Sequence, residues 1–128
     1  MAFTQSAQPS LANRLRGALT SRDIEALGAL LSDDVQWGDG DDPRACHNRA
    51  DVIATLTRAL LTGVDGTLVD LQTGKKGIFC YFSVTRPRSE LQEGARDVFH
   101  VYLVKDDQIY LIRSFEDRTS AAKAAGIK

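Results

Sequence analysis

The residues best suited to chemistry in this chain begin with an acid that follows a tryptophan. Asp39 lies two positions after Trp37, at the end of a short alternating segment that follows an amphipathic stretch. Residues two apart on a strand point to the same face, so the carboxylate and the indole can share a pocket. Apolar surroundings raise the pKa of a carboxyl group, which suits a general base. The alternative is a solvated acid, because residues 40–43 have the composition of a turn.

The thiols and imidazoles do not match a metal site. The soft ligands of the chain are Cys46, His47, Cys80 and His100. Adjacent Cys46 and His47 cannot reproduce the two-residue gap of a zinc knuckle. The acidic turn after Asp39 has Pro43 where a calcium loop needs a ligand. We therefore expect free thiols, no metal and no cofactor.

Composition bounds the kind of protein. The 128 residues, of which 43% are hydrophobic, fit one domain over 1–128 with a sizeable core, residues 1–9 being a flexible N-terminal segment. Sixteen basic and seventeen acidic side chains, with no basic run longer than Lys75-Lys76, argue against a nucleic-acid partner. The chain has neither a signal-peptide pattern nor an apolar run of about twenty residues, so we expect no membrane partner and a cytoplasmic location.

The first half of the sequence is predicted to be mostly helical. Apolar residues recur at helical spacing in two short stretches, the second after a capping pattern that ends at Asp23. Asn48 and Asp51 form a capping pair for a third helix, which ends at Gly63. The predicted elements are helices over 11–19, 24–31 and 48–63, and a brief strand over 35–37.

The second half changes to the two-residue period of strands. The β-rich runs cover 67–73, 78–86, 96–104 and 109–116, and a last helix covers 119–125 up to Gly126. Asp106-Asp107 between the last two strands predicts a tight hairpin. This order predicts an α+β fold, with helices on one face of a curved, mostly antiparallel sheet.

Both faces of the predicted sheet are apolar. On the second strand Cys80 and Phe82 point to one face, while Phe79 and Tyr81 point to the other. A sheet that helices cover on one side should have a polar outer face. The excess of apolar residues on the outer face predicts a homodimer packed through that face. The alternative is that isolated exposed aromatic residues need no partner.

Three segments carry a resemblance to a known family. They are LLSDDVQW at 30–37, CHNRADVI at 46–53 and IYLIRSFEDR at 109–118. With the order of elements, they make the chain similar to the nuclear transport factor 2-like superfamily. This cone-shaped, cystatin-like roll includes SnoaL-like polyketide cyclases, ketosteroid isomerase, limonene epoxide hydrolase and scytalone dehydratase. The resemblance covers nearly the whole chain and implies the fold, but the fold hosts several reactions and also pockets without chemistry.

The resemblance also implies catalytic positions. The base of the ketosteroid isomerase relatives falls on Asp39, and their enolate-binding acid falls on His100, which can also donate a hydrogen bond. Their helix tyrosine falls at about Leu15, which removes a donor typically worth roughly 3 kcal/mol of the barrier. Tyr102, on the same strand face as His100, can supply a substitute hydroxyl. The alternative for His100 is a strand histidine hydrogen-bonded to a neighbour.

The register of the resemblance divides the remaining residues between two faces. The predicted ligand-binding residues inside the cone are Trp37, Phe82, Val84, Val98, Ile112 and Ser114. The predicted outer face carries Phe79, Tyr81, Phe99, Val101, Leu111, Arg113 and Phe115. Cys46 and His47 fall near the pocket mouth in this register, and core packing is the alternative role for Trp37.

Two functions follow from these residues. The first is a dimeric protein that binds a small organic molecule in an apolar pocket. The second is a cofactor-free acid–base enzyme of the isomerase, cyclase, epoxide hydrolase or dehydratase type. In the enzyme, Asp39 is the base, His100 the hydrogen-bond donor and Tyr102 the orienting group. A protein-interaction role through the sheet face is a third possibility.

Overall fold

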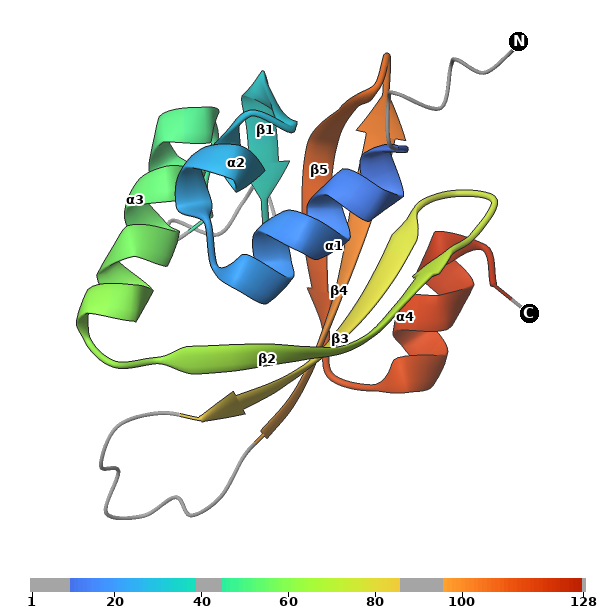
Figure 1. Cartoon of the computed structure of the whole chain (residues 1–128). Coiled ribbons are helices and arrows are strands. Elements are labelled where there is room, and N and C mark those ends of the chain that lie inside the picture. The colour runs from blue at the N-terminus through green and yellow to red at the C-terminus, as the bar shows by residue number, and fades with distance from the viewer. Residues whose placement is uncertain (1–9, 39–44, 86–95, 128) are drawn as a thin grey trace, which may run out of the picture.

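The computed structural model describes residues 10–38, 45–85 and 96–127, and they form four helices and one sheet (Figure 1). The helices are α1 (Leu11–Ser21), α2 (Ile24–Gly28), α3 (Arg49–Leu61) and α4 (Arg118–Ala125). The strands are β1 (Leu31–Trp37), β2 (Asp65–Thr73), β3 (Ile78–Thr85), β4 (Arg96–Lys105) and β5 (Gln108–Phe115). The predicted flexible segment 1–9 and Asp39 lie outside the described residues.

The sheet is mostly antiparallel, which confirms the predicted α+β class. Its strand order is β1-β5-β4-β3-β2, and β1 alone runs parallel to its neighbour. The predicted hairpin between β4 and β5 is confirmed, with Lys105 paired to Gln108 across Asp106 and Asp107. Both turn residues have positive φ values, 54° and 62°, as a two-residue turn of the twisted hairpin requires.

Each helix begins at a residue whose side chain accepts a hydrogen bond from the first turn. Asn48 accepts from the Asp51 amide at 2.8 Å, as predicted, and Asp117 accepts from the Ser120 amide at 2.7 Å. Such caps satisfy backbone donors that have no partner within the helix. None of the helices in the described ranges is long and apolar enough to cross a membrane.

The second predicted helix was too long. It ends at Gly28, and Leu31 is instead the first residue of β1, paired with Ile109 of β5. Both Leu30 and Leu31 are buried, so their apolar character fits a strand as well as a helix face. The pairing with β5 decides between helix and strand for these residues. This pairing involves residues far away in the chain, so no local pattern in the sequence predicts it.

The helices cover both faces of the sheet, which corrects the prediction that they lie on one face. We call the face toward α1, α2 and α3 the inner face, and the face toward α4 the outer face (Figure 1). Phe79, Phe99 and Val101 on the outer face are buried together with Ala121 and Ala125 of α4. The apolar outer face is therefore largely covered from within the chain.

The turn between β2 and β3 holds the end of α4. The Ala125 carbonyl accepts hydrogen bonds from the amides of Lys76 at 2.9 Å and Gly77 at 3.1 Å. A Cβ atom added at Gly74 would overlap the same carbonyl oxygen. Glycine is therefore required at this close approach between turn and helix.

Candidate functional site

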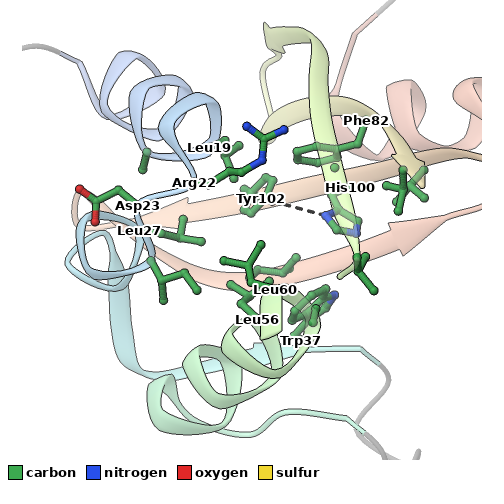
Figure 2. A pocket seen from close by; sticks show the side chains of 18 residues that line it. Leu19, Arg22, Asp23, Leu27, Trp37, Leu56, Leu60, Phe82, His100 and Tyr102 are labelled. Atoms are coloured by element: carbon green, nitrogen blue, oxygen red, sulfur yellow. Dashed lines mark hydrogen bonds between the residues drawn. The ribbon is translucent and has the colours of Figure 1, made fainter. Parts of the chain in front are cut away.

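A cavity of about 280 Å³ lies between the inner face of the sheet and the helices α1, α2 and α3 (Figure 2). Strands β3 and β4 supply part of its wall, and Leu27 and Leu56 line it from α2 and α3. Most lining side chains are aliphatic or aromatic. The cavity is thus suited to an apolar molecule rather than to a chain of waters.

Five of the six residues predicted to bind a ligand line this cavity: Trp37, Phe82, Val84, Val98 and Ile112. The sixth, Ser114, is exposed and is not among the lining residues. Its hydroxyl oxygen accepts a hydrogen bond from the Trp37 indole N–H, with a nitrogen–oxygen distance of 3.2 Å. Ser114 therefore acts on the cavity through the orientation of Trp37.

His100 and Tyr102 form a polar pair in the cavity wall (Figure 2). They lie two residues apart on β4, so both point to the inner face, and His100 Nδ1 lies 3.4 Å from the Tyr102 hydroxyl oxygen. Tyr102 is only 4% exposed. The structure thus brings these two predicted residues together, while Asp39 lies outside the described part of the chain.

Desolvation favours the neutral form of both members of the pair. Desolvation lowers the pKa of His100 from 6.5 to about 4, because the charged imidazolium is disfavoured away from water. Desolvation also raises the pKa of Tyr102 well above its usual 10. At neutral pH the pair offers hydrogen-bonding groups without a net charge.

Aromatic rings hold the imidazole of His100 on several sides. Trp37 meets it edge-on, with 5.5 Å between ring centroids, and Phe82 lies 5.3 Å away. The Tyr102 ring is 6.0 Å away at a steep angle. Edge-to-face packing of this kind fixes ring orientation and replaces part of the water around the half-buried imidazole, which lowers the pKa of His100.

Two charged residues at the corner between α1 and α2 line the cavity: Arg22 and Asp23. The Asp23 carboxylate accepts from the Ala26 amide at 3.0 Å and caps α2. Arg22 forms an ion pair with Asp65 at the start of β2, at 2.7 Å. The pair could not be predicted from the sequence, because 43 positions separate its members and no local pattern links them.

The thiols do not contribute to the cavity. Cys46 and His47 were placed near the pocket mouth by the resemblance, but neither lines the cavity. Both cysteines are free, as predicted, and the Cys46 sulfur lies 3.4 Å from the Thr55 hydroxyl. Within the described ranges, no three His, Cys, Asp or Glu side chains are grouped so as to hold a metal ion.

Comparisons with known proteins identify the fold. No protein-family model matches the sequence, and no curated protein matches it. A candidate polyketide cyclase from Sinorhizobium meliloti matches in structure, with 11% identity over 88% of this chain and 100% of that one, at a TM-score of 0.64. An LEH-like epoxide hydrolase from M. tuberculosis is 16% identical over 90% of this chain and 86% of its own, at a TM-score of 0.59.

A third similar structure is a protein with a ketosteroid isomerase-like fold from Catenulispora acidiphila, solved with trimethylamine. It is 14% identical over 94% of this chain and 95% of its own, with a TM-score of 0.62. Other matching structures are described as having cystatin-like folds. This chain therefore has the nuclear transport factor 2-like, cystatin-like fold, which is the fold that the resemblance implied.

Proposed function

We propose that the protein binds a small, neutral, mainly apolar organic molecule in the cavity beneath α1, α2 and α3. The observation that carries this proposal is a cavity of about 280 Å³ whose wall is mainly apolar, with one neutral polar pair inside it and two charged residues, Arg22 and Asp23, at its exposed rim. Ligand pockets usually span about 300–1,000 Å³, so this cavity suits a ligand at the small end of that range.

The preference for a neutral ligand follows from the electrostatics of the wall. An unpaired charge that moves from water into an apolar site loses its hydration without compensation, and this desolvation costs on the order of several kcal/mol. The two charged lining residues are already engaged, Arg22 by Asp65 and Asp23 by the Ala26 amide. Neither is thus a ready partner for a charged ligand.

The polar pair defines where a hydrogen-bonding group of the ligand would lie. A phenol can donate and accept, and a neutral imidazole carries one donor and one acceptor nitrogen. A carbonyl or hydroxyl group beside His100 and Tyr102 could therefore be satisfied. The rest of the ligand would pack against the surrounding apolar side chains.

Fluorescence titration with the neutral probe N-phenyl-1-naphthylamine (NPN) tests the proposal. Trp37 is the only tryptophan of the chain and lines the cavity, so bound NPN should quench its emission with a stoichiometry of one. Ala59 lines the cavity on α3, and Ala54 on the same helix is exposed and does not line it.

We expect Ala59→Phe to weaken NPN binding about tenfold, because an overfilled site costs about 1–3 kcal/mol. Ala54→Phe is the matched control and should bind NPN like the wild type. Equal binding by wild type and both variants would place the probe elsewhere and contradict the proposal.

A second candidate function is cofactor-free acid–base catalysis in the same cavity. The neutral His100 beside the Tyr102 hydroxyl favours it, because such donors can stabilise a developing oxyanion. Asp39 would be the base. With any substrate that turns over, Asp39→Asn should keep NPN binding and abolish turnover, whereas His100→Phe should reduce turnover less completely.

Self-association through the outer face and a cytoplasmic location stay predictions. Because α4 covers Phe79, Phe99 and Val101, the outer surface that a second copy could use is mainly that of β5. Leu111 and Phe115 are half-buried there, and the Arg113 guanidinium lies over the Phe115 ring at 5.1 Å. Sedimentation at micromolar concentration would distinguish a dimer from a monomer.

A further inference from the structure

The exposed part of the cavity wall is confined to one rim. Of the described residues that line the cavity, only Arg22, Asp23 and Leu60 are exposed. Arg22 and Asp23 come from the corner between α1 and α2, and Leu60 comes from the end of α3 (Figure 2). The described part of the wall therefore reaches the molecular surface where these helix ends face the start of β2.

An ion pair crosses this rim. Two nitrogens of the Arg22 guanidinium contact one oxygen of Asp65, Nη2 at 2.7 Å and Nε at 2.9 Å. The side chains are 41% and 58% exposed, so the pair lies at the surface and not inside the cavity. Arg22 also lines the cavity, which places the pair directly at its edge.

Both ends of the ion pair are anchored in secondary structure. The Arg22 backbone ends α1 in a left-handed conformation, with φ at 56°, and its amide donates to the carbonyls of Ala18 and Leu19. Asp65 begins β2, pairs with Thr85 of β3, and its carbonyl accepts from the Thr85 hydroxyl at 3.3 Å. We call α1, α2 and α3, which cover the cavity, the helical roof. The pair thus joins this roof to β2, the edge strand of the sheet, across the rim.

We infer that the ligand enters and leaves between the α1–α2 corner and β2, and that the Arg22–Asp65 pair holds this route closed. This inference rests on the proposed function. Asp65 does not line the cavity, and Arg22 reaches it at the exposed rim, so breaking the pair should change how fast the ligand exchanges more than how tightly it binds.

The size of the effect follows from the exposure of the pair. Solvent-exposed ion pairs contribute up to about 1 kcal/mol, which is about fivefold in a rate constant. Such a contact breaks often enough to let a ligand pass. High salt should weaken it, because screening acts strongly on exposed charges.

Stopped-flow mixing of the full chain with NPN tests the inference. We expect Asp65→Asn to raise the association and dissociation rate constants about fivefold and to leave Kd within about twofold, because Asp65 does not line the cavity. Arg22→Gln should raise the two rate constants by a similar factor. The double variant should exchange no faster than either single variant, because both remove the same contact. Added salt should accelerate exchange in the wild type and have little effect in the variants.

The chain offers a matched control. Arg14, also on α1, pairs with Asp107 at 3.1 Å, with side chains 36% and 74% exposed, and neither residue lines the cavity. Arg14→Gln should leave both rate constants unchanged. If Arg22→Gln exchanges NPN like Arg14→Gln while the wild type binds NPN in the cavity, the inferred route is wrong and the proposed function stands. If NPN does not bind the wild type in the cavity, both are wrong.

Discussion

The two faces of the sheet are built from alternate residues of the same strands, yet one is filled and the other is hollow. On the outer face Phe79 is 1% exposed and packs against α4 with Phe99 and Val101. On the inner face, Phe82 and His100 border a cavity of about 280 Å³. Strand composition alone therefore does not determine where a protein of this fold is dense and where it is open.

The position of the helices explains the difference. The main contacts of α4 are with the strands β3, β4 and β5, and its buried face consists of the small residues Ala121 and Ala125. On the inner side, α1 chiefly contacts β2 and α3 chiefly contacts β1, which are the two edges of the sheet. Because α1 and α3 rest on the edge strands, they leave space over the central strands of the inner face. On the outer face, α4 packs directly on the central strands and leaves no such space.

The largest expected effect is a difference in stability between two variants, each of which truncates a phenylalanine on one face of the sheet. Phe79→Ala should lower the free energy of unfolding by about 3–5 kcal/mol, because it opens a void in a closely packed cluster. Phe82→Ala should cost about half as much or less, since one side of that ring already faces empty space. Urea unfolding of both variants measures the difference. Equal losses would mean that the two faces are equally well packed.

A smaller effect concerns the turn that holds α4 on the outer face. Gly74→Ala should destabilise the protein by about 2 kcal/mol, because the new methyl group displaces the end of α4 from the turn. Gly17→Ala is the control, since nothing lies near its added Cβ, and a better helix former at an exposed site of α1 should stabilise by up to about 1 kcal/mol. A Gly74→Ala protein as stable as the wild type in urea would show that this contact does not constrain α4.

The smallest expected effect tests whether water reaches His100 on the inner face of the sheet. The pKa of His100 is about 4 in the folded protein and near 6.5 when unfolded. Between these values the unfolded chain binds the extra proton, so the free energy of unfolding falls as pH falls from 6.5 to 4. The slope should be at most about 1.4 kcal/mol per pH unit. Urea unfolding at several pH values measures it.

His100→Phe should remove this pH-dependent component, because it removes the titrating group. His47→Gln is the control and should keep it, because His47 is exposed and does not line the cavity. A wild-type stability curve with the same pH dependence as that of His100→Phe would show that water reaches the imidazole.

Much of the fold could be predicted from the sequence because its signals are local. The Asn48 cap, the Asp106-Asp107 turn and the glycine after α4 each act within a few residues, and all three are confirmed. The boundary at Leu31 and the side on which α4 packs could not be predicted, because both depend on partners distant in the sequence.

The candidate site was predictable on the strands and not on the helices. Alternation on β4 places His100 and Tyr102 together, and the same register places Phe82 and Val98 beside them. The helical roof has no comparable register, so the sequence did not reveal the contact between Arg22 and Asp65. Ser114 was placed on the correct strand, but it is exposed and contacts the indole N–H of Trp37 instead of lining the cavity.

The parallel pairing of β1 with β5 has a consequence for the order of folding. Strands β2 to β5 follow one another as hairpins, whereas Leu31 must find Ile109 across most of the chain. Contacts between distant residues close late because of their loop entropy, so we expect the meander to form first and β1 to dock afterwards. The same hierarchy makes β1 the part of the sheet that opens most easily. Its amides should exchange with deuterium sooner than those of β3 and β4, because an edge strand can open while the central strands stay paired.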